Sequence, residues 1–316
     1  MKVALPFRHQ ASLVCDEARE MLQNAGFELV CNEKGVRLPR EEQMELIKDA
    51  YEIIAGTETY DREMLEACKN LKVIIRFGVG TDNFDLDAMR DLGIQVGVIS
   101  NFNAVAEFAL TLMLAAMKSL PLFDKEVRGG GWKRYPMREL RKKTVGIVGF
   151  GRIGKRLAEL LSGFDVEILA YDPYMNLQDA EERKVQAVSL DELLERADVV
   201  SLHMPLTEGT VHLINKETLA KMKDGAYLIN TSRGKLVDEK ALADALQSGK
   251  LAGAALDVFE TEPVTSADHP LFAMDNTVFA PHVSAASFEV NYNGGLICAE
   301  SIIRVADGGR PLYPLF

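Results

Sequence analysis

A glycine-rich segment in the middle of the chain has the spacing that holds a phosphate group. Gly149, Gly151 and Gly154 form a G-x-G-x-x-G pattern that follows an apolar, β-branched run and precedes a helix-like stretch. The first glycine permits a tight turn, the second lets a pyrophosphate approach the backbone, and the third lets the helix pack closely on the strand. The free N–H groups at the helix start, at Arg152 and Ile153, then face the phosphates. The alternative is a purely structural turn.

An acidic residue ends the next predicted strand. Asp172 follows the apolar run at residues 166–171 and comes 18 positions after Gly154. A carboxylate at this place accepts hydrogen bonds from the adenosine ribose hydroxyls and repels a 2′-phosphate. The glycine pattern and this carboxylate together favour NAD over NADP as the bound dinucleotide.

Three charged side chains each follow another predicted strand of the same region. They are Arg233, Glu262 and His282. Ligands of a doubly wound sheet bind outside the carboxyl ends of its strands. We therefore expect these three groups to lie near the nicotinamide of the bound dinucleotide.

These residue types suit the reduction of a 2-keto acid. Arg binds the carboxylate or the carbonyl through its planar fork. His passes a proton to the carbonyl oxygen as a hydride reaches the carbon, and a neighbouring Glu stabilises the protonated ring and fixes its orientation. Arg233, Glu262 and His282 are therefore the candidate catalytic residues. Glu260 competes with Glu262 for the same role, and His203 is a further candidate.

The surrounding segments alternate between predicted strands and predicted helices. Strands are predicted at residues 2–5, 27–30, 51–55, 71–76, 94–98, 145–148, 166–171, 199–202, 227–230, 252–258 and 277–280. Helices are predicted at residues 18–25, 41–50, 103–118, 155–161, 190–195, 216–222, 239–248 and 284–307. This alternation is typical of parallel sheets covered on both faces, and the six strands from residue 145 onward match a six-stranded doubly wound sheet.

The glycine turn begins nearly halfway along the chain, so a separate domain must precede it. We predict a substrate domain from residues 1–100 plus 285–316 and an NAD-binding Rossmann domain from residues 101–284. The helix at 284–307 returns to the first domain, and the long apolar helix at 103–118 crosses between the two. The fold class is α/β, with two Rossmann-like or flavodoxin-like domains, doubly wound parallel sheets and a cleft between them.

The composition limits the partners and the compartment. The chain has 316 residues and a net charge of -11, which argues against nucleic acid and anionic membranes as partners. Its 4 cysteines are scattered without metal-ligand spacing, so we expect reduced thiols, a cytoplasmic location and no metal. The N-terminus begins with a strand and is not a signal peptide, and no apolar run reaches the length of a bilayer.

Seven motifs in order carry a resemblance to one family. They are Phe77–Asn83 (F-G-V-G-T-D-N), Val105–Glu107 (V-A-E), the glycine turn, His203–Thr207 (H-M-P-L-T), Asn230–Gly234 (N-T-S-R-G), Leu256–Pro263 (L-D-V-F-E-T-E-P) and Pro281–His282. Over essentially its full length the chain resembles the D-isomer-specific 2-hydroxyacid dehydrogenases, in particular the phosphoglycerate dehydrogenase and hydroxypyruvate reductase branch. The resemblance implies NAD as cofactor and reversible hydride transfer between NAD(H) and a small 2-keto or 2-hydroxy acid.

The resemblance also implies roles for the matched residues. Arg233 binds the substrate, Glu262 pairs with the catalytic histidine, and His282 is the general acid and base. The backbone at Gly78, Val79 and Gly80 receives the substrate carboxylate across the domain cleft. The implied cofactor-binding residues are Gly149, Gly151, Arg152, Ile153, Gly154, Asp172, His203, Pro205, Thr210, Thr231, Ser232 and Asp257. The family further implies a homodimer formed through the cofactor domain, around the helix at 103–118 and the segment that contains Trp132.

One segment departs from the family pattern. Ile54–Glu58 stands where many members have an Arg-Ser pair that binds the substrate's phosphate, although some short phosphoglycerate dehydrogenases have an Ala-Gly version. Arg8 and Arg76 are candidate replacements for that positive charge, and ordinary surface charges are the alternative. We also expect no serine-binding regulatory domain after Phe316.

A rival interpretation is a non-catalytic NAD(H)-sensing binding protein on the same fold, because a fold does not determine a function. Retention of the Arg, the Glu and the His favours the enzyme. The resemblance favours a D-3-phosphoglycerate dehydrogenase-like activity, with a hydroxypyruvate or glyoxylate reductase as the alternative. The sequence leaves the substrate open among 3-phosphoglycerate, hydroxypyruvate or D-glycerate, glyoxylate and longer 2-keto acids.

Overall fold

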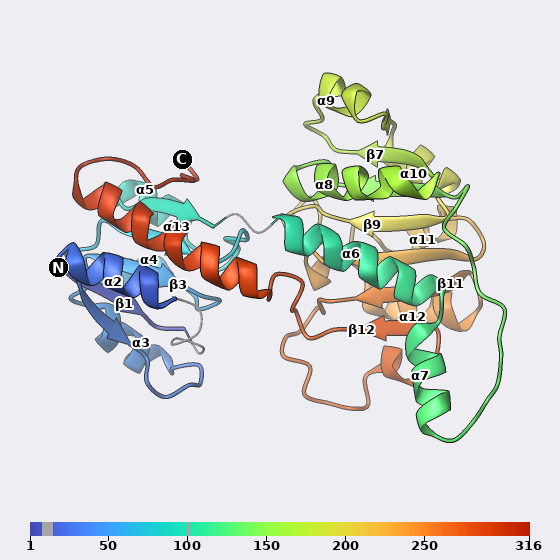
Figure 1. Ribbon diagram of the computed structural model, residues 1–316, viewed down its shortest axis with the longest axis horizontal. Helices are drawn as coiled ribbons and strands as arrows, with labels where there is room; N and C mark the ends of the chain where they lie inside the picture. The colour runs from blue at the N-terminus through green and yellow to red at the C-terminus, as the bar shows by residue number, and fades with distance from the viewer. Residues whose placement is uncertain (8–14, 100–101) are drawn as a thin grey trace. The chain divides into compact units, whose positions relative to one another are not determined.

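The computed structural model describes residues 1–7, 15–99 and 102–316 and divides into two compact units. Unit 1 consists of Met1–Asn101 and Ala285–Phe316, and unit 2 consists of Phe102–Ser284. Unit 1 is thus built from both ends of the chain, drawn in blue and red in Figure 1. Arg8 lies outside the described residues.

Unit 1 is a five-stranded parallel sheet with helices on both faces. Its elements are β1 (Lys2–Leu5), α2 (Asp16–Asn24), β2 (Glu28–Cys31), α3 (Arg40–Ile47), β3 (Glu52–Ala55), α4 (Arg62–Ala67), β4 (Val73–Arg76), α5 (Leu86–Asp91), β5 (Gln95–Val98) and α13 (Phe288–Ala306). The strand order is β2-β1-β3-β4-β5, which is the flavodoxin-like order.

Alternation along the strands builds two apolar layers in unit 1. Ile53 and Ile74 face the side covered by α3, α4 and α5, whereas Ile54 and Ile75 pack with α2 and α13. Successive residues of each strand are therefore buried on opposite faces, as a parallel sheet inside an α/β unit requires.

Unit 2 is a larger parallel sheet that carries the glycine turn. Its elements are α6 (Phe102–Met117), α7 (Leu120–Arg128), β6 (Thr144–Val148), α8 (Arg152–Leu161), η1 (Ser162–Phe164), β7 (Glu167–Tyr171), α9 (Leu177–Glu182), β8 (Gln186–Ala187), α10 (Leu190–Arg196), β9 (Val199–Leu202), α11 (Lys216–Lys221), β10 (Ala226–Asn230), η2 (Gly234–Leu236), α12 (Glu239–Gln247), β11 (Leu251–Leu256), η3 (Pro270–Ala273) and β12 (Thr277–Phe279). The strand order is β12-β11-β10-β9-β6-β7-β8, and every pair is parallel. The carboxyl ends of all these strands therefore lie along one edge.

The helices of unit 2 cover both faces of this sheet. α10, α11 and α12 pack with Leu202 and Leu228 on one face, whereas α6 and α8 pack with Val199 and Ile229 on the other. Figure 1 shows α6 and α8 running across the same side of the unit 2 strands. The α/β class and the two parallel sheets predicted from the sequence are confirmed.

Several predicted boundaries were wrong. The larger sheet has seven strands and not six, because β8 adds two exposed residues at its edge that form no apolar run. α7 was not predicted, since none of its residues is fully buried. β11 ends at Leu256, so Asp257 follows the strand instead of lying in it, and α13 begins at Phe288, after the predicted start at residue 284.

Among the described residues, no single helix is both long and apolar enough to cross a membrane. α6 and α7 satisfy length and composition only when taken as a pair, with a bend of 62° between them.

A buried carboxylate lies at the amino end of β3. Glu52 is 1% exposed, and its Oε2 has no hydrogen-bond partner among the described residues. Burial raises the pKa of Glu52 to about 8, although the charge of the N-terminal amine opposes the shift. The folded chain therefore keeps this group protonated at neutral pH, while the unfolded chain ionises it near pH 4.3.

We expect Glu52→Gln to change the pH dependence of stability. Between about pH 4.3 and 8 the unfolded chain releases a proton that the folded chain keeps, so the free energy of unfolding falls by about 1.4 kcal/mol per pH unit. The variant removes this loss, so its midpoint of thermal unfolding should exceed the wild-type value at pH 7–8 and equal it near pH 4. Circular dichroism melts across this range test it, with Glu28→Gln, at an exposed position of β2, as the control. If the unfolding midpoints of wild type and Glu52→Gln changed in parallel with pH, the raised pKa of Glu52 would be contradicted.

Candidate active site

The glycine turn after β6 has the geometry of a phosphate-binding turn. Gly149 has φ of +100°, and a Cβ at this position would lie 2.6 Å from the carbonyl carbon of His203. A Cβ at Gly154 would lie 2.2 Å from the carbonyl oxygen of Gly149, so only glycine allows this helix to pack so closely. A Cβ at Gly151 would meet no atom within 4 Å, which leaves that side of the turn open. The turn therefore fits a pyrophosphate at the amino end of α8, where Arg152 and Ile153 begin the helix.

The carboxylate of Asp172 is fixed by two backbone N–H groups. Its Oδ2 accepts from Phe150 at 2.8 Å and its Oδ1 accepts from Tyr174 at 2.8 Å. The first bond ties the end of β7 to the glycine turn, so Asp172 is held beside the turn as the sequence predicts. Its placement fits a ribose that donates two hydroxyl hydrogens to a carboxylate.

Two buried polar atoms at neighbouring strand ends have no hydrogen-bond partner among the described residues. They are Nδ1 of His203, after β9, and Oγ1 of Thr231, after β10. The other ring nitrogen of His203 contacts Oγ of Ser201 at 2.9 Å, and burial lowers the pKa of His203 to about 4, so the ring is neutral. Unsatisfied buried polar atoms are costly, and a bound ligand with amide or hydroxyl groups at this edge would satisfy them.

The loop after β9 is closed by its own side chains. Oγ1 of Thr210 donates to the carbonyl oxygen of Pro205 at 2.8 Å and accepts from the N–H of Thr207 at 2.7 Å. Thr210 is buried, whereas Pro205 is exposed. Of these two predicted cofactor-binding residues, Thr210 thus shapes the loop and Pro205 presents its surface.

Asn230 holds the turn that carries the candidate substrate arginine. Its Nδ2 donates to the carbonyl oxygen of Arg233 at 2.9 Å, and its Oδ1 accepts from the N–H of Ser232 at 3.0 Å. Oγ of Ser232 donates to the carbonyl oxygen of Leu202, at the end of the neighbouring strand, at 3.1 Å. Asn230 had no predicted role. An Asn at the end of a buried strand and directly before a turn was the available signal.

Asp257 holds the segment that contains His282. It is fully buried, and its two carboxylate oxygens accept from the N–H groups of Val283 and Ser284, each at 2.8 Å. Its carbonyl oxygen also accepts from the N–H of His282 at 2.7 Å. His282 has φ of +55°, a left-handed conformation that is uncommon for a residue with a side chain. These bonds keep the histidine in this conformation.

His282 and Glu262 form a hydrogen-bonded pair. Nδ1 of His282 lies 2.7 Å from Oε2 of Glu262, and the side chains are 44% and 34% exposed. Burial alone would raise the pKa of Glu262, but the hydrogen bond and charge of His282, the N–H of Phe259 and the charge of Arg233 outweigh it. The net shift of this pKa is downward, so Glu262 is ionised at neutral pH.

Glu260 does not make this contact. It lies 3.5 Å from Nε2 of His212 and exchanges hydrogen bonds with Glu239. Of the two candidates Glu260 and Glu262, it is Glu262 that contacts His282, and its catalytic role stays a prediction. His212 and His269, which had no context in the sequence, each lie beside one of the carboxylates Glu260 and Glu239.

In unit 1, the predicted substrate loop follows β4. Val79 is 46% exposed, while Gly78 is buried. The guanidinium of Arg76 folds back on this loop and donates to the carbonyl oxygens of Gly80 and Phe77, each at 2.9 Å. These hydrogen bonds of Arg76 stabilise the loop. From the sequence, Arg76 was instead a candidate to bind the substrate's phosphate.

Taken together, unit 2 is an α/β unit with a phosphate-binding type of glycine turn and a hydrogen-bonded histidine–glutamate pair after strands of one sheet. Residues 110–284 match the family described as D-isomer specific 2-hydroxyacid dehydrogenase, NAD binding domain. The chain is 40% identical over 303 residues to the D-3-phosphoglycerate dehydrogenase of Archaeoglobus fulgidus, covering 94% of this chain and 57% of that protein. It is 40% identical over 322 residues to the glyoxylate reductase of Thermofilum pendens, covering 98% of this chain and 94% of that protein.

A solved structure from Thermus thermophilus has a TM-score of 0.90 at 33% identity and covers 100% of both chains. The chain therefore belongs to the D-isomer-specific 2-hydroxyacid dehydrogenase family, and the predicted resemblance and NAD as cofactor are confirmed. The chain spans about half the length of several curated relatives, for example 57% of the Archaeoglobus protein and 49% of the D-3-phosphoglycerate dehydrogenase of Mycobacterium tuberculosis.

We expect Gly154→Ala to damage the cofactor turn. The added Cβ would lie 2.2 Å from a backbone oxygen, so α8 must move away from β6. Unit 2 should lose about 1–3 kcal/mol of stability, and NADH should bind at least about tenfold more weakly. Thermal unfolding and a fluorescence titration with NADH measure both effects. Gly163→Ala is the control, because its Cβ would meet nothing within 4 Å. Equal NADH affinity in the two variants would refute this role for the turn.

Proposed function

We propose that the chain is an NAD-dependent oxidoreductase that interconverts a small D-2-hydroxy acid and the corresponding 2-keto acid. The observation that carries this proposal is the 2.7 Å contact between Glu262 and His282. This pair follows strands of the same sheet edge as the glycine turn, and the pairing of a titratable ring with an ionised carboxylate suits proton transfer.

Each candidate residue has a chemical task in this reaction. NADH, when bound, supplies the hydride. Because Nδ1 of His282 faces Glu262, Nε2 is the ring atom that remains to give its proton to the carbonyl oxygen of the substrate. Arg233 holds the substrate's carboxylate or carbonyl, and Glu262 stabilises the protonated ring. We also assign the backbone of Gly78–Gly80 to substrate binding and the residues around the glycine turn to the cofactor.

The proposal extends to whether the substrate acid carries a phosphate group. The relatives named D-3-phosphoglycerate dehydrogenase suggest a phosphorylated substrate, and those named glyoxylate reductase suggest an unphosphorylated one. Two observations favour the unphosphorylated substrate. Arg76 donates to the carbonyl oxygens of its own loop, and the loop after β3 contributes a buried carboxylate, Glu58, where a phosphate would need a cation.

We further propose a homodimer and a cytoplasmic location. Trp132 is 77% exposed and Met137 is 53% exposed in the segment between α7 and β6, which is unusual exposure for large apolar side chains. A second copy of the chain would cover them. The 4 cysteines are free thiols, which suits a reducing compartment.

We expect His282→Ala and Arg233→Ala each to lower kcat by about a thousandfold or more while NADH still binds. The first variant removes the proton donor and the second removes the cation that orients the substrate, whereas neither belongs to the glycine turn. Initial rates with a 2-keto acid and an NADH titration measure the two effects. If His282→Ala kept near-normal turnover, the assignment of the acid and base would be wrong.

A panel of 2-keto acids tests the substrate. We expect NADH oxidation with glyoxylate or hydroxypyruvate to have a higher kcat/KM than with 3-phosphohydroxypyruvate, pyruvate or 2-ketoglutarate. A preference for 3-phosphohydroxypyruvate would instead assign phosphoglycerate dehydrogenase activity. Tight NADH binding with no oxidation across the panel would support the rival, a protein that senses NAD(H) without catalysis.

A further inference from the structure

We propose that Glu239 and Glu260 form a clamp that positions Glu262 against His282. The Glu239–Glu260 clamp consists of two carboxylates that each accept the other residue's backbone N–H. Both are positioning residues, because neither contacts His282. The inference rests on the proposed function for its catalytic consequence, but its structural part stands on contacts within unit 2 alone.

The exchange of hydrogen bonds is reciprocal. Oε1 of Glu239 accepts from the N–H of Glu260 at 2.8 Å, and Oε1 of Glu260 accepts from the N–H of Glu239 at 2.9 Å. The two residues lie 21 positions apart, so the exchange ties the start of α12 to the turn after β11. Bonds from backbone N–H to an ionised carboxylate are stronger than neutral ones, so two of them form a firm connection.

Each carboxylate of the clamp also faces a histidine. Oε2 of Glu239 lies 3.0 Å from Nε2 of His269, whose Nδ1 accepts from the N–H of Leu271 at 3.4 Å. Nε2 of His269 therefore carries a hydrogen and donates it to Glu239. Oε2 of Glu260 lies 3.5 Å from Nε2 of His212. These contacts offset the cost of holding two negative groups close together.

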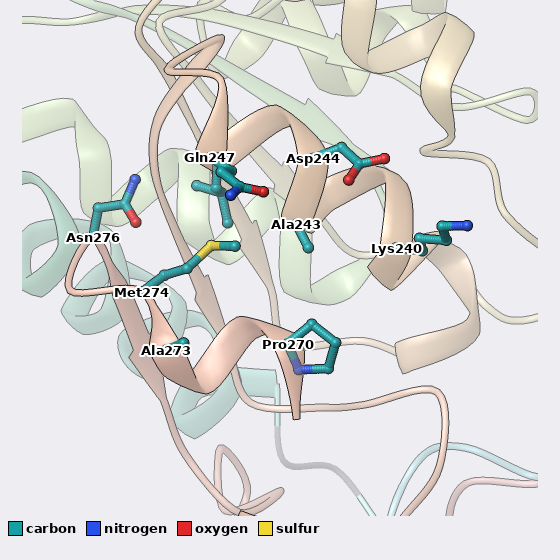
Figure 2. A pocket seen from close by; sticks show the side chains of 9 residues that line it. Lys240, Ala243, Asp244, Gln247, Pro270, Ala273, Met274 and Asn276 are labelled. Carbon is teal, nitrogen blue, oxygen red and sulfur yellow. The ribbon is translucent and has the colours of Figure 1, made fainter. Parts of the chain in front are cut away.

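Figure 2 shows a pocket lined by residues of α12 and of the η3 segment. Lys240 on α12 and Pro270 at the start of η3, the neighbours of Glu239 and His269, line opposite sides of a pocket of about 430 Å³. This pocket contains none of the predicted site residues. Neither Glu239 nor Glu260 lines this pocket, and the turn that contains Glu260 follows β11 at the same sheet edge as Glu262.

The clamped turn has little freedom. A Cβ on Gly234 would lie 1.8 Å from the carbonyl carbon of Phe259, so the turn is pressed against the residue that follows Arg233. The N–H of Phe259 donates to Oε1 of Glu262 at 3.0 Å, which leaves Oε2 of Glu262 for His282. Fixing Glu260 thus fixes the spacing between Arg233, Glu262 and His282.

Capping of α12 does not account for Glu239. Asp238 is the N-cap residue, and its side chain already accepts from the N–H of Ala241 at 3.0 Å. The side chain of Glu239 turns away from the helix to a segment 21 positions distant. A role in helix stability alone would not require a reciprocal bond from the same segment.

The test combines Glu239→Ala with Glu262→Gln in a double-mutant cycle. We expect Glu239→Ala to lower kcat about tenfold or more, because a displacement of about 1 Å at reacting groups has effects of this size, while the Kd for NADH changes less than about twofold. In the Glu262→Gln background the same substitution should change kcat less than about twofold, since its effect passes through Glu262. Glu239→Gln, which keeps an oxygen for the N–H of Glu260, should recover most of the activity.

A control variant and a hydrogen-exchange measurement distinguish failure of the clamp from failure of the proposed function. Lys240→Ala, at the next and exposed position of α12, is the matched control and should leave kcat unchanged. Hydrogen exchange needs no turnover, and Glu239→Ala should speed exchange of the Glu260 amide at least about tenfold. If the exchange rate or kcat is unchanged, the clamp does not position Glu262. If wild type shows no turnover but the exchange changes as expected, the clamp stands and the proposed function fails.

Discussion

The parallel register of the larger sheet is the constraint on which the candidate site depends. β6, β9, β10, β11 and β12 run in one direction as neighbours, so the residues that follow them leave the sheet at one edge. Gly149 and His282, although distant in the chain, therefore both lie along this edge, because each follows a strand of the sheet. A single antiparallel strand in this order would carry its residues to the opposite edge.

Along this edge, carboxylates take up the backbone N–H groups that the turns leave unpaired. Asp172 does so beside the glycine turn, Asp257 does so behind His282, and Glu239 and Glu260 do so for each other. Each such bond contributes about 1.5–3 kcal/mol because the acceptor is charged. Turns that would otherwise be mobile thus become rigid supports for the side chains that they carry.

The strands of both sheets, and the edge at which the strands of the larger sheet end, could be predicted from the sequence because both follow from hydrophobic periodicity. Apolar runs bounded by polar turns identify the strands, and the end of each strand identifies the residues that reach the edge. Contacts that depend on the backbone path of a turn could not be predicted from periodicity. Glu260 and Glu262 differ by two positions, and only the fold of their turn decides which one meets His282.

The same limit explains the other omissions. Glu239 contacts a backbone N–H, which leaves no signature in residue type or spacing, and the only signal for Asn230 was its place between a strand and a turn. Arg76 has the charge expected for a phosphate ligand, yet its guanidinium is used by carbonyl oxygens of the loop that follows it. β8 is two exposed residues with no apolar pattern to detect.

The composition of unit 1 from both ends of the chain has a consequence for synthesis. α13 packs against α2 in unit 1, with Tyr292 bonded to Glu17 across 275 positions of the chain. All of unit 2 emerges from the ribosome before α13 does, and domains fold as units during translation. The nascent NAD-binding unit is therefore complete while the face of the smaller sheet that contains Ile54 is still partly uncovered. In this order, a helix made after unit 2 completes a unit whose first strands were made before it.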